Sequence, residues 1–429
     1  ADGTLPRSFR VLQALCGAVA ARCVVPPPAL VLLVPRDEHV PVPELTAMGA
    51  YARSARAEDP RLAWRLIHYD GSSNRDVRAQ MVWHQLHSVT GDVEVSDRVR
   101  VESLVEHVPG EPLADLPPTG GVYVVTGGLG GAARILARHL AATQAASLVL
   151  VGRSAPGERS EQFVAQLGEL GGQAIYVAAD VSTREGAERV RAAAMDRFGS
   201  VTCILHAAGV VHDGPLAQQT AEGVRTASAP KLAGARCLEA AFTDTGLQLI
   251  VLFSSLTARF GNAGQSAYAY ANGSLEALAE VWEAERRRGN RTHRTVAVAW
   301  PIWRDGGMRT EPAALEWMER NTGLVPLDEQ AAVEAYEQAV RVQAPTVVVL
   351  HGHEERIRRV VGLAEQPEPL TEGVTPTPPT DTEPASAPPA EALFLTSDDQ
   401  LADLDHAQLA ALLRAEIDTL NLEMQEDLP

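Results

Sequence analysis

A glycine-rich segment between an apolar run and a helical stretch constrains the fold of this chain most strongly. Residues 122–125 predict a buried strand, and TGGLGGAA follows at residues 126–133, where a helix over residues 131–142 begins. Glycines in this place permit a tight turn and let the helix N-terminus approach a pyrophosphate closely. In the GxGxxG pattern the small positions are Gly128, Gly130 and Ala133, with Ala as a permitted substitute. The order strand, loop, helix therefore predicts a dinucleotide-binding unit.

Regular alternation of apolar runs and helical patterns continues after this segment. Helices are predicted for residues 161–170, 184–198, a long stretch around Lys231, a stretch from Ser266 and residues 328–341. Strands are predicted for residues 147–151, 174–177, 201–205, 249–253, 295–299 and 346–350. Such alternation predicts an α/β fold, a doubly wound parallel sheet of the Rossmann type.

The segment before the glycine-rich loop has the same character on a smaller scale. Strands are predicted at residues 29–34 and 64–69, and helices at residues 9–21, 43–57 and 76–86. No glycine-rich phosphate loop follows either strand, so we expect a truncated Rossmann-like structural subdomain without a cofactor site. A break rich in Pro and Gly (VPGEPLADLPPTGG, residues 108–121) separates the two parts. The predicted boundaries are 1–116 for the structural subdomain and 117–365 for the catalytic subdomain.

The C-terminal part of the sequence changes character twice. Residues 366–392 are rich in Pro, Thr and acidic residues, which predicts a solvated, disordered linker. Residues 393–429 contain an amphipathic pattern of helical period, whose apolar face needs burial. One interpretation is a docking or self-association element, and the other is a helix that folds back on its own domain.

Charge and cysteine usage restrict the class of partner. Lys and Arg number 37 and Asp and Glu 55, so the formal charge is 37 − 55 = −18, which argues against a nucleic-acid surface and an anionic membrane surface. The four cysteines have no metal-ligand spacing, and we predict no metal site. The absence of a long apolar run and of a signal-peptide pattern favours a cytoplasmic protein. The abrupt start without Met indicates that the chain was excised from a longer polypeptide.

The residue after the second strand of the large sheet bears on cofactor choice. Arg153 stands where an acidic residue would accept a hydrogen bond from the ribose 2′-hydroxyl of NAD. A guanidinium there suits a 2′-phosphate and predicts NADPH, although an ordinary surface Arg is the alternative. Asp180 and Val181 are predicted to border the adenine, and a helix N-cap is the alternative for Asp180. The remaining predicted cofactor contacts are Thr126, Leu129, Gly131, Ser154, Ala207, Ala208 and Gly209.

The stretch from residue 249 to 277 contains the candidate catalytic groups. A strand ends in Ser254 and Ser255, and a helix from Ser266 carries Tyr268 and Asn272 four residues apart on one face. If the intervening loop folds back, a hydroxyl, a phenol and an amide surround one point where a carbonyl oxygen would be held and protonated. The alternative is a Ser-rich strand end with a core Tyr.

These motifs together carry a family resemblance. The segments TGGLGGAA, VGRS, HAAGVVHDGPL, PKLAGA, LFSS, GQSAYAYAN and WPIWRDGGM occur in order over about residues 120–360. The chain resembles the ketoreductase domains of modular type I polyketide synthases, which belong to the short-chain dehydrogenase/reductase superfamily. Residues 43–70 resemble the structural subdomain that precedes the catalytic one in these reductases. The WPIWRDGGM segment resembles most closely the synthases that lack built-in acyltransferases.

The resemblance implies a catalytic tetrad. Its spacing is matched by Lys231, Ser255 and Tyr268, with separations of 255 − 231 = 24 and 268 − 255 = 13. This selects Ser255 over Ser254 and Tyr268 over Tyr270. Tyr268 is expected to donate the proton, with Lys231 as the nearby cation and Ser255 bonded to the substrate oxygen. The fourth member, Asn272, is expected to orient the lysine and water side of the network.

The resemblance also bears on stereochemistry. One group of these reductases carries Leu-Asp-Asp where this chain has Val211, His212 and Asp213, and the opposite group carries Trp at the position of Phe260 (268 − 8). These residues imply a B-type reductase that makes a D-configured β-hydroxyl. Further residues expected at the substrate groove are Gln265 and, in a lid, Trp303 and Met308.

The implied activity is NADPH-dependent reduction of the β-keto group of a polyketide intermediate on an acyl carrier protein, as in antibiotic biosynthesis. The implied partners are that carrier protein and other domains of a multidomain megasynthase, reached through the C-terminal helix. One alternative is a catalytically silent, structural reductase-like module. Another is a free-standing reductase of small metabolites, which the N-terminal subdomain and the Pro-rich tail disfavour.

Overall fold

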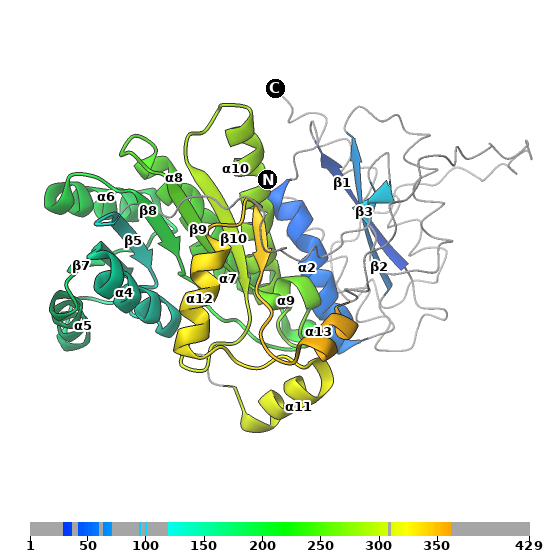
Figure 1. The fold of residues 1–429 in the computed structure, drawn as a ribbon. Coiled ribbons are helices and arrows are strands. Elements are labelled where there is room, and N and C mark those ends of the chain that lie inside the picture. The colour runs from blue at the N-terminus through cyan, green and yellow to red at the C-terminus, as the bar shows by residue number, and fades with distance from the viewer. Residues whose placement is uncertain are drawn as a thin grey trace, which may run out of the picture. The chain divides into compact units, whose positions relative to one another are not determined.

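A computed structural model describes residues 29–36, 42–59, 63–70, 94–95, 99–100, 119–307 and 310–361, and residues 29–361 form one compact unit (Figure 1). The helices predicted at residues 9–21 and 76–86, the linker at 366–392 and the amphipathic helix at 393–429 lie outside the described residues. Within the described part, no helix combines the length and apolarity that crossing a membrane requires.

The N-terminal part contains the predicted strand–helix–strand unit. Strand β1 (Ala29–Arg36) pairs in parallel with β2 (Ala63–Asp70), and helix α2 (Pro43–Glu58) connects them in sequence. The short strands β3 (Glu94–Val95) and β4 (Val99–Arg100) form an antiparallel pair. Parallel pairing across an intervening helix is the geometry of a βαβ unit, as predicted.

A seven-stranded parallel sheet forms the centre of the catalytic part, in the order β11-β10-β9-β8-β5-β6-β7. Its strands are β5 (Val122–Thr126), β6 (Ser147–Gly152), β7 (Gln173–Ala178), β8 (Cys203–His206), β9 (Leu249–Ser255), β10 (Arg294–Trp300) and β11 (Thr346–Val348). The chain winds outward from β5 through β7 and then returns to the other side of β5 with β8. The prediction of a doubly wound parallel sheet is confirmed.

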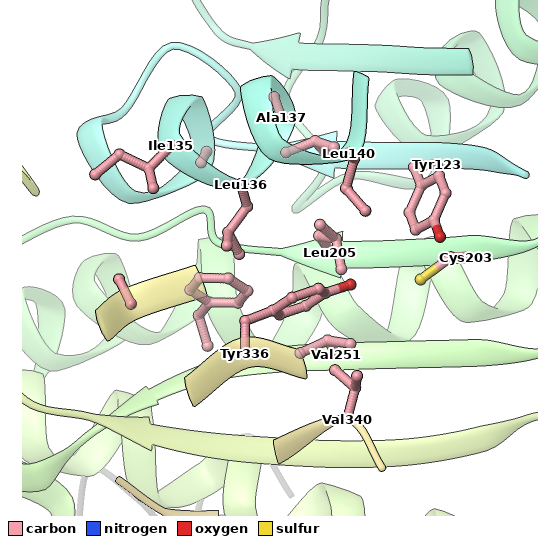
Figure 2. Close-up of a cluster of buried hydrophobic side chains, with 14 of the residues drawn as sticks. Tyr123, Ile135, Leu136, Ala137, Leu140, Cys203, Leu205, Val251, Tyr336 and Val340 are labelled. Carbon is pink, nitrogen blue, oxygen red and sulfur yellow. The ribbon is translucent and has the colours of Figure 1, made fainter. Parts of the chain in front are cut away.

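Helices cover both faces of this sheet. One face packs against α4 (Gly131–Gln144), α5 (Glu158–Glu169) and α12 (Glu329–Ala339). Figure 2 shows Leu136 and Leu140 on one side and Tyr336 on the other, enclosing the buried Leu205 between them. The opposite face packs against α6 (Arg184–Phe198), α8 (Gly234–Phe242) and α10 (Ser266–Arg287). The inner strands β5, β8, β9 and β10 are therefore buried on both faces, which explains their continuous apolar runs, whereas the edge strands β7 and β11 are mostly half-buried.

The region around Lys231 differs from the single long helix that was predicted. Helix α7 (Ala221–Ser228) passes into a π-helical segment, η2 (Ala229–Ala233), before α8 begins at Gly234. Pro230 lies in this segment and has no backbone N–H to donate to an ordinary helical turn. A π-helical turn inside a helix is frequent at functional sites.

Besides the short strands β3 and β4, the sequence pattern missed four short elements in the described part of the catalytic subdomain. These are the 3-10 turn η1 (Leu216–Gln218) and the helices α9 (Leu256–Phe260), α11 (Pro312–Thr322) and α13 (Glu354–Val360). Helix α9 has only five residues, and α11 has no buried residue, so neither shows the apolar periodicity of a packed helix.

Candidate active site

The candidate site lies at the carboxyl ends of β5, β8 and β9. In a doubly wound sheet, ligands bind outside the carboxyl ends of the strands, where the winding direction reverses. Here the reversal falls between β5 and β8. Thr126 ends β5, His206 ends β8 and Ser255 ends β9, so the topology brings residues up to 129 positions apart (255 − 126) to strand ends on one edge of the sheet.

The loop after β5 is shaped for close backbone approach. Gly127 has φ +64°, and a Cβ there would lie 2.9 Å from the carbonyl oxygen of Ala207. A Cβ on Gly128 would lie 2.9 Å from the Cβ of Leu150. Gly130 is the N-cap of α4 and supplies no side-chain cap, so the helix N-terminal N–H groups are open to an anion. This cradle fits the pyrophosphate of a dinucleotide.

Gly131 has a different role from its neighbours in the loop. A Cβ there would lie 2.3 Å from the carbonyl oxygen of Asp305 and 2.4 Å from the carbonyl carbon of Gly306. The glycine therefore allows the segment after β10 to pack directly on the first turn of α4. Leu129 is partly buried in the same loop, and its carbonyl oxygen accepts a hydrogen bond from Arg159 at 2.9 Å.

The predicted adenosine side is exposed and charged. Arg153 follows β6 and is exposed, and its charge contributes to lowering the pKa of Asp180. The largest cause of that lowered pKa is the hydrogen bond from the Ser182 hydroxyl, at 2.7 Å from Asp180 Oδ1. A guanidinium in this position fits a 2′-phosphate. The carbonyl oxygen of Ser154 accepts a hydrogen bond from the Tyr176 hydroxyl at 2.9 Å.

Val181 and the segment after β8 border the same edge. Val181 is buried in the core cluster beneath α6 and α8, so little of its side chain remains for contact with an adenine. Ala207 and Ala208 are partly buried, and Gly209 is exposed. A Cβ on Gly209 would lie 3.0 Å from Lys231 Cε, so this glycine leaves room for the lysine.

Lys231 is buried and directed toward the end of β9. Its side chain is held by the π-helical segment, and Nζ donates to the carbonyl oxygen of Phe253 at 2.7 Å. Burial lowers the pKa of Lys231 to about 7. A buried ammonium with one fixed acceptor keeps two N–H donors for other partners.

Ser255, Tyr268 and Asn272 lie together. Ser255 caps α9 by accepting from the Thr257 N–H at 3.2 Å, and its side chain also hydrogen-bonds Tyr268. Burial raises the pKa of Tyr268, the Ser255 and Asn272 side chains lower it by hydrogen bonding, and the charge of Asp213 raises it. Asn272 is fully buried, and its Nδ2 donates to the Tyr268 carbonyl oxygen at 2.8 Å.

The amide oxygen of Asn272 is buried, and among the described residues it has no hydrogen-bond partner. Lys231 Nζ is directed to Phe253 O and not to this oxygen. An unsatisfied buried acceptor costs free energy and is typical of a site that binds water or a ligand. The structure thus brings Ser255, Tyr268 and Asn272 together. The Lys231 ammonium group bonds to the backbone of β9 beside them, at Phe253.

The neighbouring Ser254 and Tyr270 point elsewhere. Ser254 Oγ lies 2.6 Å from Glu276 Oε1, inside the protein. Tyr270 is fully buried, and burial and the charge of Glu44 on α2 raise its pKa. Both arrangements favour Ser255 and Tyr268 as the members of the site.

Two of the residues proposed to control the substrate, Asp213 and Gln265, line a pocket of about 410 Å³. Gln265 Nε2 donates to Asp213 Oδ2 at 2.9 Å, which joins the loop after β8 to the loop before α10. Phe260, at the end of α9, is 41% exposed. The pocket is lined by Glu58, Asp213, Gly214, Pro215, Asn262, Ala263, Gly264 and Gln265.

The structure does not support a lid position for Trp303. Its side chain is 5% exposed and makes an edge contact with Trp300, with ring centroids 5.0 Å apart. Its backbone also forms a bridge to Leu327. An indole packed in the main core cannot serve as a mobile cover, so that expectation is corrected. Met308 lies outside the described residues.

His206 is a residue that the pattern missed. It is fully buried, and burial, followed by the charge of Lys231, lowers its pKa to about 4, so the ring is neutral near pH 7. Nε2 lies 3.0 Å from the Lys231 carbonyl oxygen, which can only accept, so the network assigns the proton to Nε2. Nδ1 then accepts from the Thr126 hydroxyl at 2.9 Å, and that hydroxyl accepts from the Ala208 N–H at 3.0 Å.

This chain of bonds links the glycine-rich loop, the end of β8 and the π-helical segment that holds Lys231. The only available signal in the sequence was a His at the end of an apolar strand. Among the described residues, no group of His, Cys, Asp and Glu side chains is arranged to hold a metal ion.

Comparisons with known proteins show which proteins this chain is similar to. The sequence model of the KR domain family matches residues 121–305. Polyketide synthase PksL of Bacillus subtilis (strain 168) is 31% identical over 318 residues, which is 73% of this chain and 7% of the relative. Polyketide synthase ThaG of Burkholderia thailandensis is 34% identical over 277 residues, 64% of this chain and 5% of the relative. The chain therefore spans less than a tenth of the length of these curated relatives.

Solved structures of similar fold include ketoreductases. A ketoreductase domain from the bacillaene assembly line superposes with a TM-score of 0.75 at 24% identity, covering 83% of this chain and 84% of that one. An A-type ketoreductase from a modular polyketide synthase gives a TM-score of 0.69 at 27% identity, covering 85% of this chain and 76% of that one.

Proposed function

Because residues 121–305 belong to the KR domain family of polyketide synthases, we propose that this chain is an NADPH-dependent β-ketoacyl reductase. Its substrate would be a β-ketoacyl thioester carried by an acyl carrier protein, and its product the β-hydroxyacyl thioester. The contact between Ser255 and Tyr268 beside the unpartnered Asn272 Oδ1 is the observation that carries this proposal.

The glycine-rich loop and Arg153 would hold the cofactor. The open N-terminus of α4 suits the pyrophosphate, and the exposed guanidinium of Arg153 beside Asp180 suits a 2′-phosphate. When bound, NADPH supplies a hydride to the carbonyl carbon of the substrate. The Thr126 hydroxyl at the start of this loop accepts from the Ala208 N–H and bonds to the buried His206, which fixes the loop to the end of β8.

The protein side chains would manage the oxygen of the reacting carbonyl. Ser255 donates a hydrogen bond to it, and Tyr268 transfers its phenolic proton as negative charge develops there. A free tyrosine has a pKa near 10 and burial raises that of Tyr268, so release of this proton needs a nearby positive charge. The buried Lys231 would supply that charge, since its ammonium group bonds to the carbonyl oxygen of Phe253, two residues before Ser255.

The unsatisfied amide oxygen of Asn272 has a place in this scheme. A water that donates to Asn272 Oδ1 and accepts from Lys231 Nζ would satisfy both buried groups. Such a water would relay a proton from solvent toward the Tyr268 phenolate, which loses one proton in each turnover. The domain boundaries at 1–116 and 117–365 and the tetrad roles remain part of this proposal.

The product is proposed to be D-configured, as expected of a B-type reductase. Asp213 matches the final Asp of the Leu-Asp-Asp pattern, whereas Val211 and His212 depart from it, and Asp213 lines the pocket and bonds to Gln265. The position of the opposing Trp is occupied by the exposed Phe260. An A-type ketoreductase shares the overall fold at 27% identity, so the fold does not distinguish the two stereochemical types. The B-type assignment is supported by these local residues alone.

The acyl carrier protein and other synthase domains are the proposed partners. The curated relatives are far longer than this chain and are polyketide synthases. The segment at residues 393–429 is proposed to dock such a partner.

Incubation with a small β-ketoacyl thioester and either NADPH or NADH tests the proposal. We expect consumption of NADPH at least about tenfold faster than of NADH, and a D-configured alcohol on chiral separation of the products. NADPH binding without oxidation would assign the chain to the silent structural modules, and an L-configured product would exclude the B-type assignment.

A further inference from the structure

Glu58, the last residue of α2, reaches from the N-terminal segment to two loops of the catalytic part. Its Oε2 accepts from the Leu216 N–H at 2.7 Å, and its Oε1 accepts from the Gly264 N–H at 3.0 Å. Leu216 begins the turn after the Asp213 loop, whereas Gly264 lies in the loop between α9 and α10. One carboxylate therefore joins two backbone segments 48 positions apart (264 − 216) through charge-assisted hydrogen bonds.

The two loops held by Glu58 are the walls of the pocket beside the candidate site. Glu58 itself lines that pocket together with Asp213 and Gln265. The loops also contact each other directly, since the Gly214 N–H donates to the Gly264 carbonyl oxygen at 2.9 Å and Gln265 donates to Asp213 at 2.9 Å. The spacing between the walls thus depends on three links, of which the Glu58 carboxylate is the one that comes from a third element.

The rest of α2 supports the same loop. The guanidinium of Arg53 donates twice to the Ala258 carbonyl oxygen, at 2.7 and 3.1 Å, and Ser54 Oγ accepts from the Asn262 N–H at 3.0 Å. Gly261 has φ +74°, and a Cβ there would lie 2.6 Å from the Arg53 carbonyl carbon, so only glycine permits this approach. Three polar side chains of α2, those of Arg53, Ser54 and Glu58, therefore bond to the backbone between Ala258 in α9 and Gly264 in the following loop.

We propose that Glu58 is a positioning residue that sets the width of the substrate pocket and so the orientation in which the β-ketoacyl chain reaches Tyr268. This rests on the proposed ketoreductase function. Tyr268 lies in the first turn of α10, three residues after Gln265, so the pocket wall and the proton donor are parts of one short segment. Glu58 contacts neither the glycine-rich loop nor the tetrad and acts only through the two loops.

Two variants test the proposal against a matched control. Glu58→Gln keeps the size of the side chain but offers only one acceptor oxygen. Its amide NH₂ group would face one of the two backbone N–H groups, so that hydrogen bond would be lost. Glu58→Ala removes both bonds. Glu44→Gln makes the same charge change on the same helix and removes the ion pair of Glu44 with Arg236 at 2.6 Å, which does not border the pocket.

For Glu58→Gln we expect the KM for the thioester to rise about tenfold and the ratio of product enantiomers to fall several-fold, because small misplacement of a substrate is costly. The kcat should change less than about threefold, and NADPH should bind as in the parent. Glu44→Gln should leave KM and the enantiomer ratio as in the parent, even where its melting temperature falls equally.

Amide hydrogen exchange gives a readout that does not require turnover. Peptides containing Leu216 and Gly264 should exchange their amide hydrogens faster in both Glu58 variants than in the parent. In Glu44→Gln their exchange rates should equal those of the parent. An active parent whose Glu58 variants keep KM, enantiomer ratio and exchange rates would overturn the positioning role. A parent that does not reduce any β-ketoacyl thioester, together with accelerated exchange in Glu58→Gln, would instead refute the proposed function and restrict Glu58 to holding the loops.

Discussion

Two adjacent serines at the end of β9 lie in environments of opposite kinds. Ser254 bonds to Glu276, at 2.6 Å, and Glu276 pairs with Arg259 at 2.6 Å, so the groups on this side find their partners within the protein. On the other side, Ser255 meets Tyr268, the buried Asn272 Oδ1 has no partner, and Lys231 has its ammonium group directed to a backbone carbonyl.

The difference indicates which side is built for stability and which for chemistry. A satisfied buried network specifies one packing, and removing a member leaves another member unpaired. Groups left unsatisfied cost stability and are kept where a substrate or water completes them. The two serines occupy successive positions on one strand, so their side chains point to opposite faces of the sheet. Substitutions on each side should therefore affect different properties, the rate on one side and the stability on the other.

The largest effect is expected for Tyr268→Phe. Loss of the proton donor should lower kcat about 10³-fold, within the range for general acid catalysis, and leave NADPH binding and the melting temperature nearly unchanged. Initial rates with a β-ketoacyl thioester and a cofactor titration measure this. Activity within a few-fold of the parent would refute the role of Tyr268 and with it the assignment of this side to chemistry.

Lys231→Met should separate catalysis from stability. We expect kcat to fall about 10²-fold, because the nearby charge is lost. Burial lowers the pKa of Lys231 to about 7 from an ordinary value of 10.5, so between these pH values the unfolded chain binds more protons than the folded chain. The parent therefore gains stability as pH rises from about 7 to 10.5.

The same substitution removes that pH dependence. The Met variant should exceed the parent in free energy of unfolding by on the order of a few kcal/mol below pH 7, and the gap should close toward pH 10. Urea unfolding from pH 6 to pH 10 follows this gap. A gap that is constant with pH would show that Lys231 is not buried in the form described here.

The two serines give the most direct comparison. Ser255→Ala should lower kcat about 10²-fold, the usual cost of removing a hydrogen-bond donor to a developing oxyanion, with little change in stability. Ser254→Ala should do the reverse, lowering the free energy of unfolding by about 1–3 kcal/mol and the rate less than about threefold. Parallel rates and denaturant unfolding measure both. Equal losses of rate in the two variants would contradict the proposed division.

The smallest effect is expected for His206→Gln. Burial lowers the pKa of His206 to about 4 from 6.5, so the parent loses stability as pH falls from 6.5 toward 4, whereas the Gln variant lacks that contribution. At pH 7 the variant should be about 1 kcal/mol less stable, because an amide replaces the imidazole bonds imperfectly. Melting temperatures at pH 7 and pH 5 check this, and equal pH dependence in the two proteins would contradict it.

Local patterns were sufficient for the sheet and for the loop after β5. Strands buried on both faces read as apolar runs, and the glycines of TGGLGGAA mark a strand–loop–helix unit. The contacts that require Gly127 and Gly131, with Ala207 and Asp305, come from distant parts of the chain and were not visible in that pattern. The π-helical break at Lys231 was not predictable in this way, since Pro230 is compatible with several local endings. Trp303 was misassigned because an aromatic residue in a loop-like segment carries no sign of whether it packs in the core.

The α/β class, the cofactor loop and, through family resemblance, the residues of the proposed tetrad could thus be predicted from the amino-acid pattern. The partner of each polar group could be found only in the folded chain: Ser254 bonds to Glu276, His206 bonds to Lys231 and Thr126, and Glu58 bonds to two loops far along the chain. The physical reason is that a periodic pattern reports burial along one element, whereas a hydrogen bond depends on the distance between elements, which packing alone sets.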